Sequence, residues 1–239
     1  MFGLEVHHLT KRYRRLTALA DVSFTVRPGE IIGLIGPNGS GKTTLFECLA
    51  GILPSDDGTV TQGGRPLAPG ERSAALFYVP DGIAPWPSQT VRWALDFTIG
   101  FFGGREDLRD EVVRRLDLEP FLDAAIGTLS KGQKKRAVLA IGLLAPQPLL
   151  LADEPFDGLD LRQTREVAAT LRAYAAGGRT LFLSIHQIND AARICDRFVL
   201  LSGGRVCGEG TIDELSALAG ARGASVRGGD LEEVFLALT

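Results

Sequence analysis

GPNGSGKT, residues 36–43, follows the continuous apolar run IIGLIG at 31–36 and leads into TTLFECLAGI, which has the pattern of a helix. It fits G-x-x-x-x-G-K-[ST]. Glycines at this spacing let backbone N–H groups converge on the β- and γ-phosphates of a nucleotide, and the helix N-terminus adds partial positive charge. Lys42 is expected to neutralise phosphate oxygens, and Thr43 to offer its hydroxyl to Mg²⁺. The stretch therefore predicts a site for a nucleoside triphosphate between a buried strand and a helix.

A second buried strand, within LLLADEP at 149–155, ends in two acidic residues. Asp153 is expected to bind Mg²⁺ directly or to lie in the second coordination shell of the ion. Glu154 is unnecessary for metal binding alone, so we assign it to polarising the attacking water as general base. The alternative is an acidic strand end near a helix N-terminus. The expected nucleotide-binding residues of the glycine-rich loop are Gly36, Pro37, Asn38, Gly39, Ser40, Gly41, Lys42, Thr43 and Thr44.

The order of apolar runs predicts one α/β domain with a mostly parallel sheet, because strands alternate with helical segments. The predicted strands are 4–13, 21–30, 31–36, 59–64, 75–80, 148–155, 180–186 and 197–210, and residues 165–177 form a predicted helix. From about residue 88 to 145 the pattern is helical with no convincing strand, which indicates a helical insertion between two halves of the sheet. The Gly-rich segment 217–229 is expected to be a loose approach to a last helix at 231–239.

Charge and composition argue against several classes of partner. The 239 residues carry a net charge of −3, so there is no general attraction for nucleic acid. The three cysteines are far apart and odd in number, which favours neither a disulfide framework nor a zinc site. The N-terminal segment lacks a signal-peptide pattern, and the longest apolar stretch, 137–152, is cut by two prolines. We therefore expect a cytoplasmic chain with no direct membrane insertion, which reaches a membrane only through a partner.

LSKGQKKRAVLAIGLLA, residues 129–145, predicts a helix that Ser130 caps at its N-terminus. Its first turns carry Lys131, Lys134, Lys135 and Arg136. Positive charge at the positive end of a helix dipole is unfavourable by about 0.3–1 kcal/mol per residue. The pattern indicates either a helix end that receives an anion or a solvated basic face.

GPNGSGKT, LSKGQ, LLLADEP, FDGLD and SIHQ, in this order, resemble the ATP-binding subunits of ABC transporters. The resemblance covers roughly residues 4–215, and LSKGQ is its discriminating element because other P-loop proteins lack it. Lys131 stands where glycine is more common, a variant associated with exporter-type members. The resemblance implies a P-loop NTPase core with an antiparallel β subdomain, ATP and Mg²⁺ as cofactors, and an ATP-hydrolysing enzyme.

The resemblance also implies domain limits and roles for single residues. The core would span 1–87 and 146–215, the helical subdomain 88–145, and a short tail 216–239. Tyr13 matches the aromatic residue that stacks on adenine, with an exposed strand-end tyrosine as the alternative. His186 matches the histidine that senses the γ-phosphate, with a structural histidine as the alternative.

Other matched residues imply that two chains pair head to tail around two nucleotides, as a homodimer or with a related ATPase subunit. In the family, residues of the LSKGQ segment approach the γ-phosphate of ATP held by the opposite copy, and the DGLD loop at 157–160 crosses the interface. Asp157 stands where serine or asparagine is more common. The matched residues are Ser130, Gly132, Gln133, Asp157 and Asp160.

YVPDGIAPW, residues 78–86, carries an aspartate where the resembled family has a glutamine that reaches Mg²⁺ and the attacking water. Asp81 is shorter than glutamine, cannot donate a hydrogen bond when ionised, and adds negative charge beside phosphates. It can still serve as an oxygen ligand for Mg²⁺. Our hypothesis is that Asp81 keeps the metal or water contact and that turnover is retuned. The alternative is that Asp81 turns outward and only begins a turn with Gly82.

TVRWALDFTIGFF, residues 90–102, is apolar on nearly every side of the predicted helix. A surface helix needs only one apolar stripe, so a second apolar face is expected to meet another protein. The alternative is a helix wholly enclosed in the insertion. The resemblance implies that this region receives a short cytoplasmic helix of a transmembrane permease subunit.

The sequence therefore predicts an ATPase subunit that drives transport through a separate permease. The segments at 210–220 and 231–239 resemble the tails of exporter-type subunits, which favours export over import. A soluble ABC ATPase of translation would carry two cassettes, and a DNA-repair type would need a long coiled coil. A kinase or GTPase would not explain LSKGQ followed by LLLADEP. The cargo is not encoded here, because it is selected by the permease.

Overall fold

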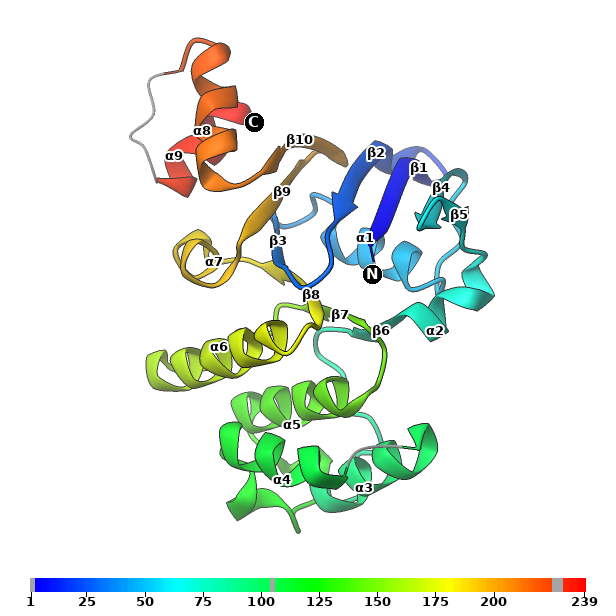
Figure 1. Ribbon diagram of the computed structural model, residues 1–239, viewed down its shortest axis with the longest axis vertical. Coiled ribbons are helices and arrows are strands. Elements are labelled where there is room, and N and C mark those ends of the chain that lie inside the picture. Colours follow the sequence, from blue (N-terminus) through cyan, green and yellow to red (C-terminus); the bar gives the residue numbers. More distant parts are fainter. Residues whose placement is uncertain (1–2, 104–105, 225–229) are drawn as a thin grey trace.

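The computed structural model describes residues 3–103, 106–224 and 230–239. Its centre is a six-stranded sheet in the order β10-β9-β3-β8-β7-β6 (Figure 1). The strands are β3 (Ile31–Ile35), β6 (Leu76–Val79), β7 (Leu149–Asp153), β8 (Thr180–Ile185), β9 (Arg197–Ser202) and β10 (Arg205–Gly210). Neighbours pair in parallel from β6 to β9, and β10 pairs antiparallel with β9. The mostly parallel sheet predicted from the sequence is confirmed.

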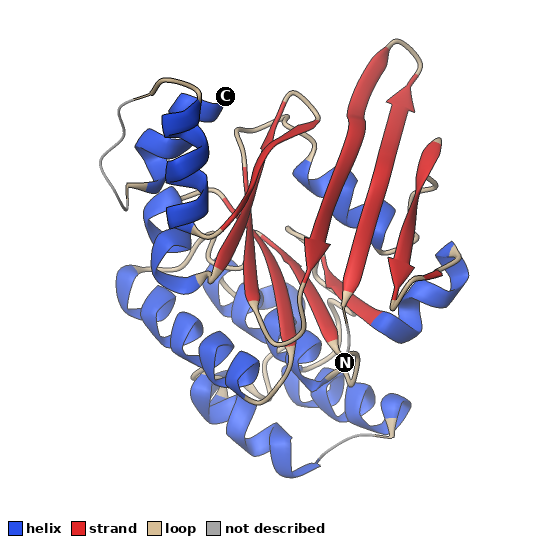
Figure 2. Ribbon diagram, turned by 45° about the horizontal axis from the view of Figure 1, so that its top comes forward, coloured by secondary structure: helices blue, strands red, loops and turns tan. Residues whose placement is uncertain are grey.

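A second sheet of four antiparallel strands has the order β2-β1-β4-β5 and stands beside the central sheet (Figure 2). Its strands are β1 (Leu4–Tyr13), β2 (Leu16–Val26), β4 (Asp57–Gln62) and β5 (Arg65–Pro66). Helix α1 (Lys42–Leu49) fills the space between the sheets, since its Phe46 and Leu49 share a core cluster with Val6 of β1 and Leu34 of β3.

The central sheet is buried on both faces, which explains the continuous apolar runs in its sequence. In β3, Ile32 and Leu34 belong to the cluster around α1, whereas Ile31 and Ile35 belong to a second cluster on the opposite face. Successive side chains of a strand point to opposite faces, so each apolar residue in the run has a core to enter. The strand before the glycine-rich loop is therefore held firmly on both sides.

Most of the remaining helices pack against the face of the central sheet that is opposite α1. They are α2 (Arg72–Ala75), α3 (Val91–Phe102), α4 (Glu106–Arg115), α5 (Lys131–Leu144), α6 (Leu161–Ala176), α7 (Ile188–Ile194), α8 (Ile212–Ala221) and α9 (Leu231–Leu238). Helices α3, α4 and α5 gather at one end, and α8 and α9 pack together at the other (Figure 1). Within the described ranges, no helix is long and apolar enough to cross a bilayer.

Four sequence predictions need correction. The strand predicted at 197–210 is two antiparallel strands, β9 and β10, joined by a turn at Gly203 and Gly204. The strand predicted at 21–30 begins at Leu16 and ends at Val26, because a turn follows at Pro28 and Gly29. The helix predicted at 165–177 begins at Leu161, where Asp160 caps it. The loose segment predicted at 217–229 is helical up to Ala221.

The sequence did not predict helix α8, because its second half falls within the Gly-rich segment 217–229. Thr211 and Glu214 form a capping box at the start of α8, and Leu215 and Ala219 are fully buried. This burial stabilises a helix through positions that look flexible by composition. Residues 225–229 of the predicted loose segment lie outside the described residues.

Candidate nucleotide-binding and catalytic site

The glycine-rich loop joins β3 to α1 at the carboxyl edge of the central sheet. Gly41, the N-cap of α1, has a left-handed φ of 106°, and a Cβ there would lie 2.6 Å from the carbonyl oxygen of Ala18. Only glycine fits this position without moving the backbone. Because no side chain caps α1, its first N–H groups are left to bind a ligand.

Lys42, the first residue of α1, is held inside this loop. Its side chain is buried, and Nζ donates hydrogen bonds to the carbonyl oxygens of Gly36 at 2.8 Å and Pro37 at 3.3 Å. The same Nζ lies 3.9 Å from Oε1 of Glu154. The backbone thus places one positive charge where the loop and the acidic strand end meet.

Thr43 and Asp153 meet across the same edge, where Oγ1 of Thr43 donates to Oδ2 of Asp153 at 2.8 Å. Strand pairing sets this geometry, because Asp153 ends β7 and is in register with Ser184 on β8. The Ser184 hydroxyl donates to the other carboxylate oxygen of Asp153. Asp153 is therefore fixed by two hydroxyl groups from different elements.

Ser184 was missed by the sequence analysis. It is fully buried, and its Oγ also accepts a hydrogen bond from the backbone N–H of Glu154 at 2.9 Å. The available signal was a hydroxyl residue within the apolar TLFLSIH, beside the strand that ends in LLLADEP. Strand pairing, rather than composition, reveals that it touches both acids.

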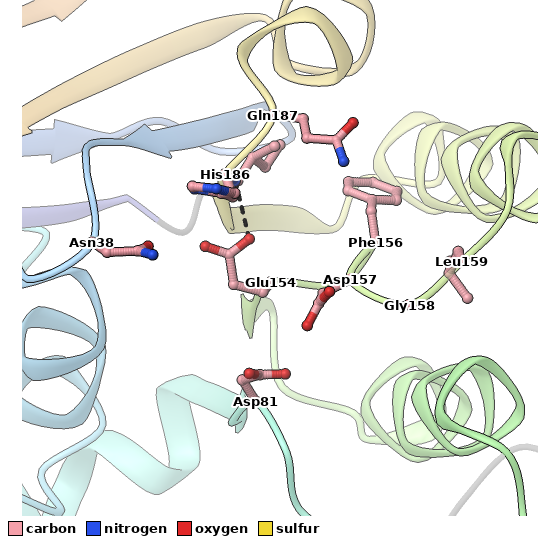
Figure 3. A pocket seen from close by; sticks show the side chains of 10 residues that line it. Asn38, Asp81, Glu154, Phe156, Asp157, Gly158, Leu159, His186 and Gln187 are labelled. Carbon is pink, nitrogen blue, oxygen red and sulfur yellow. Dashed lines mark hydrogen bonds between the residues drawn. The ribbon is translucent and has the colours of Figure 1, made fainter.

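Glu154 occupies the left-handed region with φ 49°, which is uncommon for a residue other than glycine. Its Oε2 accepts a hydrogen bond from the backbone N–H of His186 at 3.0 Å (Figure 3). Burial raises the pKa of the Glu154 carboxyl above its usual value, while the positive charge of Lys42 opposes this shift. The result is a stronger base that is held in a constrained backbone conformation.

Two adjoining cavities lie over these groups. One has a volume of about 680 Å³ and is lined by Tyr13, Lys42, Thr43, Thr44 and Asp153 among others. The other, of about 330 Å³, includes Asp157 and His186 (Figure 3). Asn38, Asp81 and Glu154 line both cavities, so these residues form the shared wall.

Asp81 begins a turn with Gly82, which has a φ of 68°, yet its side chain faces the cavities. One carboxylate oxygen, Oδ1, lies 2.5 Å from Nζ of Lys135 on α5. The sequence left two alternatives for Asp81, a contact with metal or water and a turn that points outward. The ion pair with Lys135 is a third feature that neither alternative contained.

The LSKGQ segment packs against the DGLD loop in the single chain. Ser130 and Gln133 form a capping box at the start of α5, and Asp160 caps α6. A Cβ on Gly132 would lie 2.9 Å from the carbonyl oxygen of Gly158, so the two segments approach at backbone distance. The five residues expected to contact a second copy therefore lie at the adjoining ends of two helices.

Lys131 and Asp157, which both depart from the common residues of the resembled motifs, form an ion pair of 2.6 Å. The hydrogen bond between them raises the pKa of Lys131 and lowers that of Asp157. Two of the lysines predicted at the start of α5 thus have acidic partners in the same chain, Asp157 for Lys131 and Asp81 for Lys135. This part of the helix end is neither an empty anion site nor a freely solvated basic face.

Helix α3 carries exposed aromatic side chains on one face. Val91, Ala94, Leu95 and Ile99 are buried on the other. The aromatic patch consists of Trp86, Trp93, Phe97 and Phe101, which are 38–71% exposed. Their rings contact one another with centroids 5.1–5.9 Å apart. The alternative of a wholly enclosed helix is therefore wrong.

Comparison with known proteins gives a consistent result. A family profile described as ABC transporter matches residues 19–157. The chain is 33% identical to Nod factor export ATP-binding protein I of Rhizobium etli, covering 98% of this chain and 76% of that protein. It is 30% identical to SkfA peptide export ATP-binding protein SkfE of Bacillus subtilis, over 85% of this chain and 87% of the other. A solved structure of the ATP-binding subunit of an ABC transporter superposes with a TM-score of 0.86 at 32% identity, covering 98% of both chains. The chain belongs to the ABC transporter family.

Proposed function

We propose that this member of the ABC transporter family, an ATP-hydrolysing subunit, powers export through a separate transmembrane permease. The observation that carries the proposal is the convergence of Lys42, the Thr43–Asp153 pair and Glu154 in the larger of the two adjoining cavities. Two relatives are named export ATP-binding proteins, which supports export as the direction. The proposed ligand is MgATP.

The donor set fits Mg²⁺. A threonine hydroxyl and an aspartate carboxylate lie together at the mouth of the loop, and both are hard oxygen donors. Within the part of the chain that the structure describes, no cluster of three His, Cys, Asp or Glu side chains forms a metal site. This suits an ion that takes further ligands from phosphate and water. Bound there, Mg²⁺ would neutralise charge on the β- and γ-phosphates.

Each residue of the site has a proposed task. Lys42 and the free N–H groups of α1 bind phosphate oxygens, and Tyr13, 43% exposed at the end of β1, stacks on the base. Oε1 or Oε2 of Glu154 accepts the proton of the attacking water, since its raised pKa makes it a better base. His186, at the end of β8 beside Glu154, contacts the γ-phosphate. Asp81 supplies an oxygen to the metal or the water.

We further propose that two chains close head to tail around two nucleotides, as a homodimer or with a related subunit. The start of α5 and the 157–160 loop lie side by side. They bring together the five residues Ser130, Gly132, Gln133, Asp157 and Asp160. This grouping supports a joint contact with the γ-phosphate of the other copy. ATP then acts as the bridge between the copies, and hydrolysis releases them.

The aromatic patch on α3 is the proposed seat of the permease. It includes Trp86, five residues after Asp81, so the same loop connects the cavity wall to the patch. Exposed aromatic clusters of this kind are typical of protein interfaces. The chain would thus associate with the membrane through this contact, at its cytoplasmic face.

Co-purification tests the proposal directly. The tagged chain is purified from the membranes of its native host in mild detergent and assayed for ATP hydrolysis. Recovery with a protein of several membrane spans, and hydrolysis that Glu154→Gln abolishes, would support the proposal. Recovery with ribosomes or DNA instead, without any membrane protein, would contradict it.

A further inference from the structure

Asp81 introduces an electrostatic problem at the proposed site. It lines both cavities together with Glu154, and one cavity also contains Asp153 and the other Asp157. A triphosphate that enters would meet several carboxylates in a confined space. Such like charges oppose binding strongly where the solvent is restricted.

Lys135 is placed to cancel one of these charges. Its side chain is only 9% exposed, whereas that of Asp81 is 42% exposed, and the Nζ–Oδ1 distance is 2.5 Å. Lys135 comes from α5 and lines a small separate cavity of about 220 Å³ with Asp81, Lys131 and Lys134. Asp81 thus stands between the nucleotide cavities and a lysine-lined pocket.

We propose that Lys135 is a positioning residue, which holds the Asp81 carboxylate at the cavity wall and neutralises it, so that the pair faces the triphosphate as one uncharged unit. This rests on the proposed function, because it concerns how the same site receives ATP. Asp81 supplies the oxygen acceptor and Lys135 supplies N–H donors. The pair also ties the loop after β6 to the first turns of α5.

The second ion pair supports this view of α5. Lys131 binds Asp157 one turn earlier, and the pKa of Asp157 is lowered first by its hydrogen bond with Lys131 and to a smaller extent by the charge of Lys135. Two lysines on one helix therefore neutralise two acids of the cavity wall. This also explains why positive side chains are tolerated at the positive end of the α5 dipole.

The test compares Lys135→Met in two backgrounds, by titrating the full-length chain with ATP in EDTA. With Asp81 present, Lys135→Met should weaken ATP binding about tenfold, because an uncompensated carboxylate then faces the phosphates. The double variant with Asp81→Asn, which keeps the shape and removes the second charge, is uncharged at both positions like the intact pair and should bind ATP within about twofold of wild type. Asp81→Asn alone leaves the positive charge of Lys135 uncompensated and should bind ATP more tightly than wild type.

The double variant guards against a trivial loss of folding. It carries the same packing change at residue 135, so restored binding cannot be explained by stability, and thermal melts of all four proteins accompany the titration. Asp117→Asn is the matched control: Asp117 is also half-exposed and pairs with a buried cation of α5, Arg136, but lines neither nucleotide cavity. It should not rescue Lys135→Met.

Two outcomes would overturn the inference: a double variant that binds ATP as weakly as Lys135→Met alone, which means that Lys135 only packs, or no loss of binding in Lys135→Met. Rescue by Asp117→Asn would do the same. A wild-type chain that binds ATP neither in EDTA nor in the presence of Mg²⁺ would instead overturn the proposed function, so the two failures can be told apart.

Discussion

The side chains at the carboxyl edge of the central sheet and those at the start of α5 are held in place by different interactions. At the sheet edge, hydrogen bonds between neighbouring strands and loops fix Thr43, Asp153, Ser184 and Glu154 within one chain. At the start of α5, ion pairs of exposed and half-buried side chains join Lys131 to Asp157 and Lys135 to Asp81. The first arrangement is a buried hydrogen-bond network within the sheet, whereas the second consists of ion pairs between a helix and two loops. Mutations in the two regions should therefore fail differently.

The largest effect is expected at the sheet edge, from Glu154→Gln. Removing the general base should lower turnover by about 10²–10³-fold while ATP binding is retained. Phosphate release and ATP titration measure the two properties, and gel filtration in MgATP should show more dimer than for wild type. Glu166→Gln, at a half-exposed residue of α6 that pairs with Arg162 and lines neither nucleotide cavity, serves as control and should change neither. Turnover within twofold of wild type would show that Glu154 is not the base.

Ser184→Ala should produce the next largest loss, because one hydroxyl holds both Asp153 and the backbone of Glu154. The unfolding free energy should fall by about 1–3 kcal/mol, and turnover by more than tenfold, since the left-handed conformation of Glu154 loses its support. Chemical denaturation and phosphate release report the two effects. Ser216→Ala, which removes a local helix bond on α8, should leave turnover unchanged. Full activity in Ser184→Ala would refute the positioning of the acids by β8.

The aromatic patch provides a contrast with both regions, because it should matter only for the partner. Phe97→Ala removes the ring that contacts Trp86, Trp93 and Phe101. Hydrolysis by the isolated chain should remain within about twofold of wild type, while recovery with the permease falls roughly tenfold. Leu236→Ala, an exposed apolar residue of α9, is the control. Undiminished recovery would place the permease elsewhere.

The strand, the loop and the acids of the sheet edge each leave a local signal in the sequence. A buried strand must be apolar on both faces, a tight phosphate loop requires glycine, and acids at a strand end stand out against the core. The contributions of Ser184 and Lys135 could not be predicted in this way. Both depend on which distant residue lies opposite, and the pairing of β7 with β8 or of α5 with the loop after β6 has no local signature.

The smallest predicted effect concerns stability and pH at Glu154. Burial raises the pKa of this carboxyl, so the folded chain holds the proton more tightly than the unfolded chain does. The protonated Glu154 carboxyl therefore contributes to the unfolding free energy. This contribution is complete below the pKa of the unfolded state and is lost as pH rises through the pKa of the folded state. Glu154→Gln cannot ionise, so at about pH 8 it should melt a few degrees above wild type. In a chain of this length, each kcal/mol of unfolding free energy corresponds to roughly 2–4 °C in melting temperature.

The difference in melting temperature between wild type and Glu154→Gln should shrink as the pH falls toward 4.5, the ordinary pKa of glutamate. Melting curves of nucleotide-free protein across this range measure it. A wild type that melts above Glu154→Gln at about pH 8 would mean that the attraction of Lys42 outweighs burial. The sheet edge would then resemble the start of α5, with ion pairing rather than desolvation setting the charge of its key acid.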